Sequence, residues 1–139
     1  MGCYNSCVVN APTDEVWATL RNFHDLEWAR EVLETCEPIG AAGPHEVGAG
    51  RLLNGVFKET LLELDDEGRT VRYSIDDAPG TPVAGATDYV GTIRTHPVTS
   101  DGTTFVEWSS SWSKSEGGVA EFCSPIYQGL LAALQKRFG

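Results

Sequence analysis

Two glutamates in the middle of predicted β-strands are the residues of this sequence best suited to acid–base chemistry. Glu59 lies in a β-rich run at residues 56–64, where it shares a face with Phe57, and Glu107 lies in another run at residues 103–113. A carboxyl group that folding removes from water has a raised pKa and can act as a general acid or base. Glutamates around a cavity could equally form an internal ion network or orient a polar group of a ligand.

The second of these strands has two different faces. One face carries Glu107 together with Phe105 and serines, and the other carries Trp108 and Trp112. The hydrophobic pattern alone buries the tryptophan face, which turns Glu107 outward. A polar, water-filled pocket or a bulge in the strand would allow Glu107 to face inward instead.

The other reactive side chains form no recognisable catalytic or metal-binding motif. The three histidines, His24, His45 and His96, fit neither a Ser-His-Asp arrangement nor a metal-ligand spacing, and the sequence holds no phosphate-binding glycine motif. Four cysteines without a secretion signal are expected to be free thiols. We therefore expect no metal and no cofactor.

The elements that must position these residues follow the order β-α-α-β-β-β-β-β-β-α. This order predicts an α+β fold in which a curved seven-stranded antiparallel sheet wraps around a long C-terminal helix and leaves a hollow between them. Asn54-Gly55 is the strongest hairpin signal. The expected strands are residues 4–10, 32–39, 51–53, 56–64, 70–75, 87–98 and 103–113, and the expected helices follow Pro12, span residues 25–29 and span residues 116–138.

The predicted C-terminal helix is apolar over a wide arc. Phe122, Ile126 and Leu130 recur at four-residue steps, which indicates that most of the helix is covered. Pro125 interrupts this pattern, so that either the helix kinks there or a new helix starts with the proline at its first position.

Composition limits the partners that the chain can have. At 139 residues we expect one domain over residues 1–139, and the net charge of -10 argues against nucleic acid and anionic membrane surfaces. No run approaches the roughly 18 apolar residues of a membrane span, and the N-terminus has no signal-peptide pattern. We expect a cytoplasmic protein, monomeric or homodimeric, without membrane insertion.

Three stretches of the sequence carry a family resemblance. NAPTDEVWATLRNFHDLEW, LLELDDEGRTVRYSID and TFVEWSSSW, followed by a terminal helix, resemble the START-like (SRPBCC) superfamily in its polyketide cyclase/dehydrase branch. The resemblance implies the helix-grip fold. It also implies an apolar or amphipathic small-molecule ligand, because members of the superfamily bind lipids, polyketides and plant hormones.

The plant abscisic-acid receptors are more distantly similar and imply particular pocket positions. Their gate loop has no counterpart here, because the tight turn at residues 53–56 leaves no room for it, and residues 78–85 are then the candidate for a mobile mouth. This similarity turns Glu107 inward, against the hydrophobic pattern. With Phe57 added from its shared strand face, the implied ligand-binding residues are Arg30, Phe57, Glu59, Tyr73, Ile75, Tyr89, Glu107, Phe122 and Ile126.

Three functions are compatible with these observations. The first is binding of a small, largely apolar molecule. The second is a polyketide cyclase or dehydratase, in which Glu59 or Glu107 removes a proton and Tyr89 or Arg30 donates to the forming oxyanion. The third is a ligand-independent interaction domain, which solvent-facing tryptophans would support.

Overall fold

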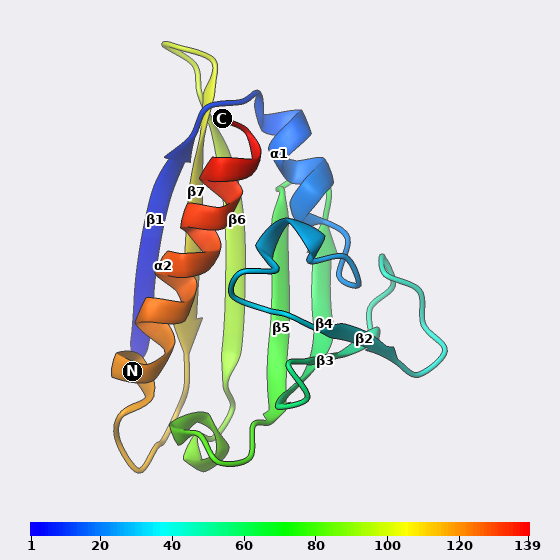
Figure 1. The fold of residues 1–139 in the computed structure, drawn as a ribbon, viewed down its shortest axis with the longest axis vertical. Coiled ribbons are helices and arrows are strands. Elements are labelled where there is room, and N and C mark those ends of the chain that lie inside the picture. The colour runs from blue at the N-terminus through cyan, green and yellow to red at the C-terminus, as the bar shows by residue number, and fades with distance from the viewer.

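The computed structural model describes all 139 residues and shows one curved sheet beside a long helix (Figure 1). Seven antiparallel strands form the sheet in the order β1-β7-β6-β5-β4-β3-β2, so the first and last strands of the chain are neighbours. The strands are β1 (Gly2–Val9), β2 (Cys36–Ile39), β3 (Gly50–Leu53), β4 (Phe57–Asp65), β5 (Thr70–Asp77), β6 (Val90–Val98) and β7 (Thr103–Ser111).

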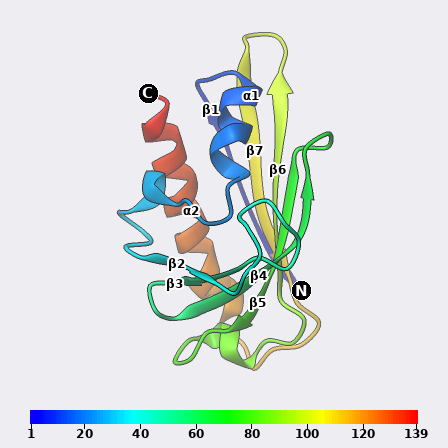
Figure 2. The same ribbon diagram turned by 90° about the vertical axis from the view of Figure 1, so that its right-hand side faces the viewer.

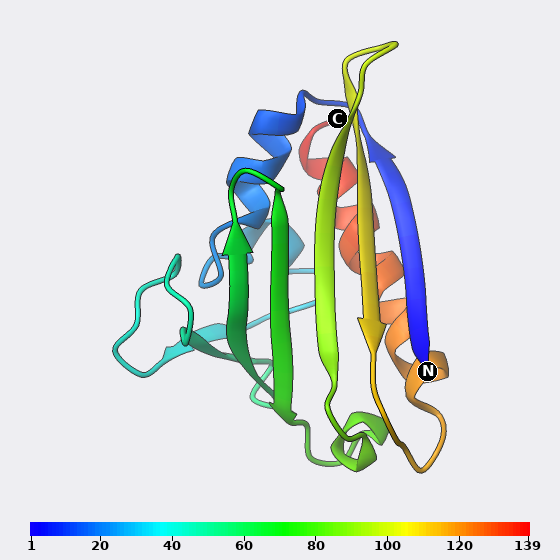
Figure 3. The same cartoon turned by 180° about the vertical axis from the view of Figure 1, so that it is seen from behind.

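The two α-helices lie on the same side of the sheet. The helices α1 (Thr13–Leu20) and α2 (Val119–Arg137) cover one face (Figure 2), and the opposite face carries no helix (Figure 3). Two short 3-10 helices, η1 (Glu27–Ala29) and η2 (Pro82–Gly85), lie in the connections. The hydrophobic core therefore lies between the inner face of the sheet and α2. This is the predicted helix-grip architecture.

The helix α2 is continuous through Pro125, and its buried side chains recur every three or four residues along one side. It begins at Val119, three residues later than predicted, because Gly117 and Gly118 adopt positive φ angles of 103° and 80°. Neither α2 nor any shorter helix combines the length and hydropathy that a membrane-spanning helix needs.

Two elements near the N-terminal third are shorter than predicted. The helix expected at residues 25–29 is the three-residue 3-10 helix η1, and the strand expected from residue 32 begins at Cys36. Residues 78–85, expected as a mobile mouth, hold η2. Thr81 directly precedes η2, and its hydroxyl accepts a hydrogen bond from the Val83 N–H. The Val83 side chain is buried, so this segment is packed onto the core.

The turn between β3 and β4 sets the register of the two strands. Asn54 and Gly55 have the positive φ angles expected of them, 54° and 65°, but Val56 also belongs to the turn. Leu53 therefore pairs with Phe57 rather than with Val56, which brings Arg51 opposite Glu59. A shift of one residue in this pairing would have placed Lys58 opposite Arg51.

Candidate functional site

A small hollow lies between the sheet and α2. Its volume is about 30 Å³, room for about one water molecule and far less than a typical small-molecule site. Of the 14 lining residues, 12 are hydrophobic, and the two charged ones are Arg51 and Glu59. The lining residues are Leu26, Leu33, Arg51, Leu53, Phe57, Glu59, Tyr73, Ile75, Tyr89, Trp108, Cys123, Ile126, Tyr127 and Leu130.

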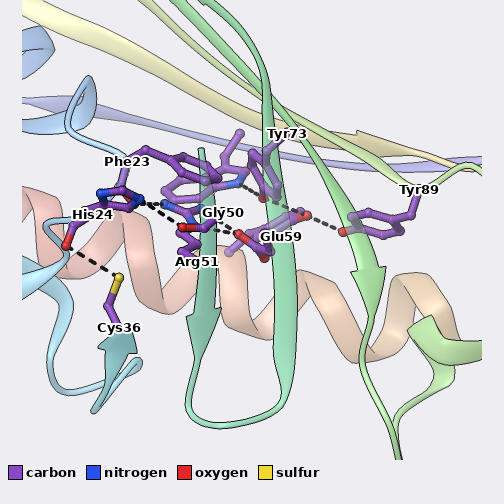
Figure 4. A network of polar contacts seen from close by, with 10 residues as sticks. Phe23, His24, Cys36, Gly50, Arg51, Glu59, Tyr73 and Tyr89 are labelled. Carbon is purple, nitrogen blue, oxygen red and sulfur yellow. Dashed lines mark hydrogen bonds and ion pairs between the residues drawn. The ribbon is translucent and has the colours of Figure 1, made fainter. Parts of the chain in front are cut away.

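Arg51 and Glu59 form a buried ion pair in the wall of this hollow (Figure 4). Arg51 is 5% exposed and Glu59 is 4% exposed. The Nε atom of Arg51 donates to Oε1 of Glu59 at 2.8 Å, and its Nη2 atom lies 2.7 Å from the same oxygen. No protein donor contacts the second carboxylate oxygen, Oε2. The hollow therefore has one polar wall with an unused acceptor.

Phe23, in the segment between α1 and η1, contacts the Arg51 guanidinium group as well. Arg51 Nη1 donates to the backbone oxygen of Phe23 at 3.1 Å, and the guanidinium carbon lies 3.9 Å from the centre of the Phe23 ring. This stacking is a cation–π contact in a desolvated place. Burial raises the pKa of Glu59, while the charge of Arg51 and its hydrogen bond oppose that shift.

Three tyrosine hydroxyls form a hydrogen-bonded chain beside the ion pair, where the Tyr73 ring centre lies 5.3 Å from the Arg51 guanidinium carbon. Trp108 Nε1 donates to the Tyr73 hydroxyl at 2.9 Å, and Tyr73 donates to Tyr127 at 3.4 Å. The Tyr89 hydroxyl also contacts the Cys123 sulfur at 3.4 Å, and it shares a hydrogen bond with Tyr127 in which either hydroxyl can be the donor. Burial raises the pKa of all three phenols, which keeps them protonated.

Because Gly91 has no side chain, it leaves room for the Tyr73 ring. Gly91 on β6 pairs with Tyr73 on β5, and a Cβ atom at this position would collide with the Tyr73 ring. The ring therefore lies flat against the backbone of β6, where its hydroxyl reaches both Trp108 and Tyr127. Glycine is the residue type that permits this close approach.

Six of the nine residues predicted to bind a ligand line the hollow. Phe57, Glu59, Tyr73, Ile75, Tyr89 and Ile126 are all in its wall. Phe122 is not part of the wall but contacts it, because its ring centre lies 6.2 Å from that of Phe57. These aromatic rings close the edge of the hollow between β4 and α2.

The expected inward position of Glu107 is wrong. Its carboxylate lies on the outer face of the sheet, where Oε2 accepts a hydrogen bond from the Tyr4 hydroxyl at 2.7 Å and Oε1 lies 2.7 Å from His96 Nε2. The opposite face of β7 buries Trp108, and Trp112 just beyond the strand is buried as well, as the hydrophobic pattern predicted. The similarity to the abscisic-acid receptors gave the wrong side for Glu107. Burying two tryptophans is favourable, whereas burying one carboxylate is costly, so the strand turns its tryptophan face inward.

Arg30 also lies away from the hollow. Its side chain is 67% exposed and pairs with Glu27 at 3.4 Å, on the outer side of η1. The buried cation is Arg51 instead, which the sequence reasoning treated only as the first residue of a strand. The three-residue turn that places Arg51 opposite Glu59 is the signal that would have found it.

The inner-face residues Tyr127 and Trp108 were not among the predicted ligand contacts. Tyr127 belongs to an apolar stripe of the predicted C-terminal helix, and Trp108 to the tryptophan face of its strand. Both patterns indicated burial, but neither indicated that the polar atoms of these side chains meet in one chain of hydrogen bonds.

A sheet that grips one C-terminal helix over a mostly apolar hollow defines a START-like (SRPBCC) domain. Residues 4–139 match the family described as "Polyketide cyclase / dehydrase and lipid transport", and the chain belongs to this family. No curated protein matches the chain.

Solved structures share the fold over almost their whole length. A protein from Nitrosospira multiformis is 43% identical, with a TM-score of 0.95 over 100% of this chain and 97% of that one. A protein from Bacillus thuringiensis is 26% identical, with a TM-score of 0.82 over 99% and 98% of the two chains. Major latex-like protein 151 of Panax ginseng shares the fold at 10% identity, with a TM-score of 0.80 over 99% and 97%.

Proposed function

We propose that the protein binds one small, largely apolar molecule in the hollow between the sheet and α2. The observation that carries this proposal is the composition of the wall, in which 12 hydrophobic residues surround a single buried ion pair. Apolar walls with a few placed polar groups are typical of small-molecule sites. The family description, which includes lipid transport, supports the same function.

The volume of about 30 Å³ sets a condition on binding, because side chains must move to admit any such ligand. Phe57, Ile75 and Ile126 are only half-buried, so they can turn outward without leaving a buried core position. The Phe57 and Phe122 rings meet at an angle of 38° and hold this edge closed. Access therefore runs between the start of β4 and the first half of α2.

A filled-pocket variant tests the proposal. The wild type should bind the neutral fluorescent dye N-phenyl-naphthylamine, and Ile126→Trp should lose most of that binding because the indole occupies the space. Ala132→Trp is the matched control, since Ala132 lies on the exposed side of the same helix. Equal dye binding by both variants would remove the hollow as the binding site. Native mass spectrometry of freshly purified protein should also detect a co-purified small molecule.

A cyclase or dehydratase is the second candidate, and Glu59 is the observation that favours it. This carboxyl is buried, has a raised pKa, lines the hollow and has one oxygen that Arg51 does not contact, as a general base requires. The proposed role of Tyr89 as hydrogen-bond donor to the forming oxyanion has less support, because its hydroxyl already bonds to Cys123. Glu59→Gln should lower turnover of a polyketide-type substrate by orders of magnitude in a cyclase but change ligand affinity only modestly in a carrier.

The interaction-domain alternative lacks the support that solvent-facing tryptophans would have given it. Trp108 and Trp112 are only 2% and 7% exposed. Trp112 stacks on the Tyr89 ring with centres 5.8 Å apart, inside the molecule.

A further inference from the structure

We infer that the ligand of this hollow carries a neutral hydroxyl group that donates a hydrogen bond to Oε2 of Glu59. The inference rests on the proposed function and names the chemical class of the ligand. It follows from which hydrogen-bonding groups of the wall are already used and which are not.

The ion pair leaves one carboxylate oxygen unused. Both contacts from Arg51 reach Oε1 of Glu59, and no protein group donates to Oε2. The Glu59 side chain is only 5% exposed, and it lines the hollow. Because the Glu59 side chain is almost wholly shielded from bulk water, a donor on the ligand gains more here than it would at the surface.

The tyrosine hydroxyls are already engaged with one another. Tyr73 donates to Tyr127, and Tyr127 and Tyr89 share a hydrogen bond in which either oxygen can be the donor. The Tyr89 hydroxyl also contacts the Cys123 sulfur at 3.4 Å. A phenol oxygen keeps acceptor capacity when its proton is bonded, so a ligand hydroxyl finds acceptors both at Glu59 and at these tyrosines.

The charge balance of the wall selects against an anion. Arg51 is already neutralised by Glu59 at 2.7 Å and bonded to the Phe23 carbonyl at 3.1 Å. A carboxylate brought into the hollow would be a second negative charge beside Glu59 with no cation of its own. Since the rest of the wall is hydrophobic apart from phenol, indole and thiol groups that already bond one another, a neutral molecule with one hydroxyl is the class that fits.

Three ligands of matched shape separate these possibilities. Para-ethylphenol, para-ethyltoluene and para-ethylbenzoate present a hydroxyl, a methyl and a carboxylate group on the same ring. Their affinities are measured by titration of the Trp108 indole N–H signal in NMR spectra. We expect the phenol to bind about tenfold or more tightly than the methyl compound, because hydrogen bonds to charged groups are strong. The benzoate should bind most weakly of the three.

A double variant links the preference to the ion pair. Arg51→Met with Glu59→Leu removes both charges at once, a change that buried pairs often tolerate. This variant should bind para-ethyltoluene at least as tightly as the wild type and lose the preference for the phenol. Thermal unfolding confirms that the variant is folded.

The possible results are distinguishable. Equal binding of the phenol and the methyl compound, tightest binding of the benzoate, or a phenol preference that survives in the double variant would overturn the hydroxyl assignment and leave the apolar site intact. Failure of all three ligands to bind would overturn both the assignment and the proposed function. A phenol preference that disappears with the ion pair supports both.

Discussion

At the scale of single residues, Arg51 and Glu59 are best understood as one neutral unit. Each charge alone would have to leave water without compensation, which is far more costly than burying the pair. The Phe23 ring and carbonyl complete the surroundings of the guanidinium group. Breaking the pair should therefore cost much more than replacing both partners.

Arg51→Met tests this reading of the pair. It leaves Glu59 as a buried carboxylate without a cation, and we expect the free energy of unfolding in urea to fall by about 3–5 kcal/mol. The double variant Arg51→Met/Glu59→Leu should recover most of that loss. A double variant as unstable as the single one would show that the packing of Arg51, rather than its charge, is what matters.

The same single variant has a predicted pH dependence. Burial raises the pKa of Glu59 and Arg51 counteracts that rise, so removing Arg51 raises this pKa further. A carboxyl with a raised pKa in the folded state costs no stability below its unfolded pKa of about 4.3, and the cost grows as the pH rises toward the folded value. Urea denaturation should therefore show the deficit of Arg51→Met shrinking with acidification. The double variant, lacking the carboxyl, should show no such recovery.

Gly91 is the second residue on which the site depends. Gly91→Ala should displace the Tyr73 ring and break its bonds to Trp108 and Tyr127, lowering the free energy of unfolding by about 1–3 kcal/mol. The indole N–H signal of Trp108 should shift at the same time. Thr92→Ala is the control, because the neighbouring side chain points to the other face of β6. Equal effects of the two changes would contradict the close approach.

At the scale of elements, the Asp66 side chain connects the β4–β5 turn to α1 and the residue that follows it. Arg21 donates to both carboxylate oxygens of Asp66 at 2.8 and 3.0 Å, and Trp17 Nε1 donates to Oδ1 at 2.9 Å. The helix thereby reaches across the ends of two strands (Figure 1). The hydrogen bonds from Arg21, and then from Trp17, lower the pKa of Asp66.

Asp66→Asn should weaken this connection without disturbing the core. We expect a loss of about 1 kcal/mol at neutral pH, because the pair is partly exposed. Since the folded pKa is lowered, the contribution of Asp66 is present above its unfolded pKa of about 3.9 and disappears as the pH falls through the folded value. Unfolding curves of variant and wild type should thus converge in acid. Glu67→Gln, next along the turn, should change stability little at any pH.

At the scale of the whole molecule, the sequence predicted the architecture better than the site. Alternation along β7 and the apolar stripes of α2 are properties of whole elements, so they survive small errors in boundaries. Which charges meet across β3 and β4 depends on a single extra turn residue, Val56, and no pattern in the strands themselves shows it. The sequence predicted that Glu59 points inward. Identifying Arg51 as its partner would have required knowing how β3 and β4 pair.

Ligand binding should be visible in hydrogen exchange across the whole molecule. A molecule that binds only the folded state slows every amide that exchanges through global unfolding, by about 100-fold when its concentration is 100 times its dissociation constant. Saturating para-ethyltoluene should therefore slow the buried strands β6 and β7 together. The turn at residues 99–102 exchanges by local opening and should be unaffected.

This pattern separates an internal ligand from a surface one. The outer face carries Tyr4 and Val8 as exposed apolar side chains on the edge strand β1. A compound held there would protect β1 locally and leave β6 and α2 at their free rates. Because the proposed site lies under α2, the amides of Ile126 and Tyr127 should slow at least as much as those of β7, and unchanged exchange in α2 would place the ligand elsewhere.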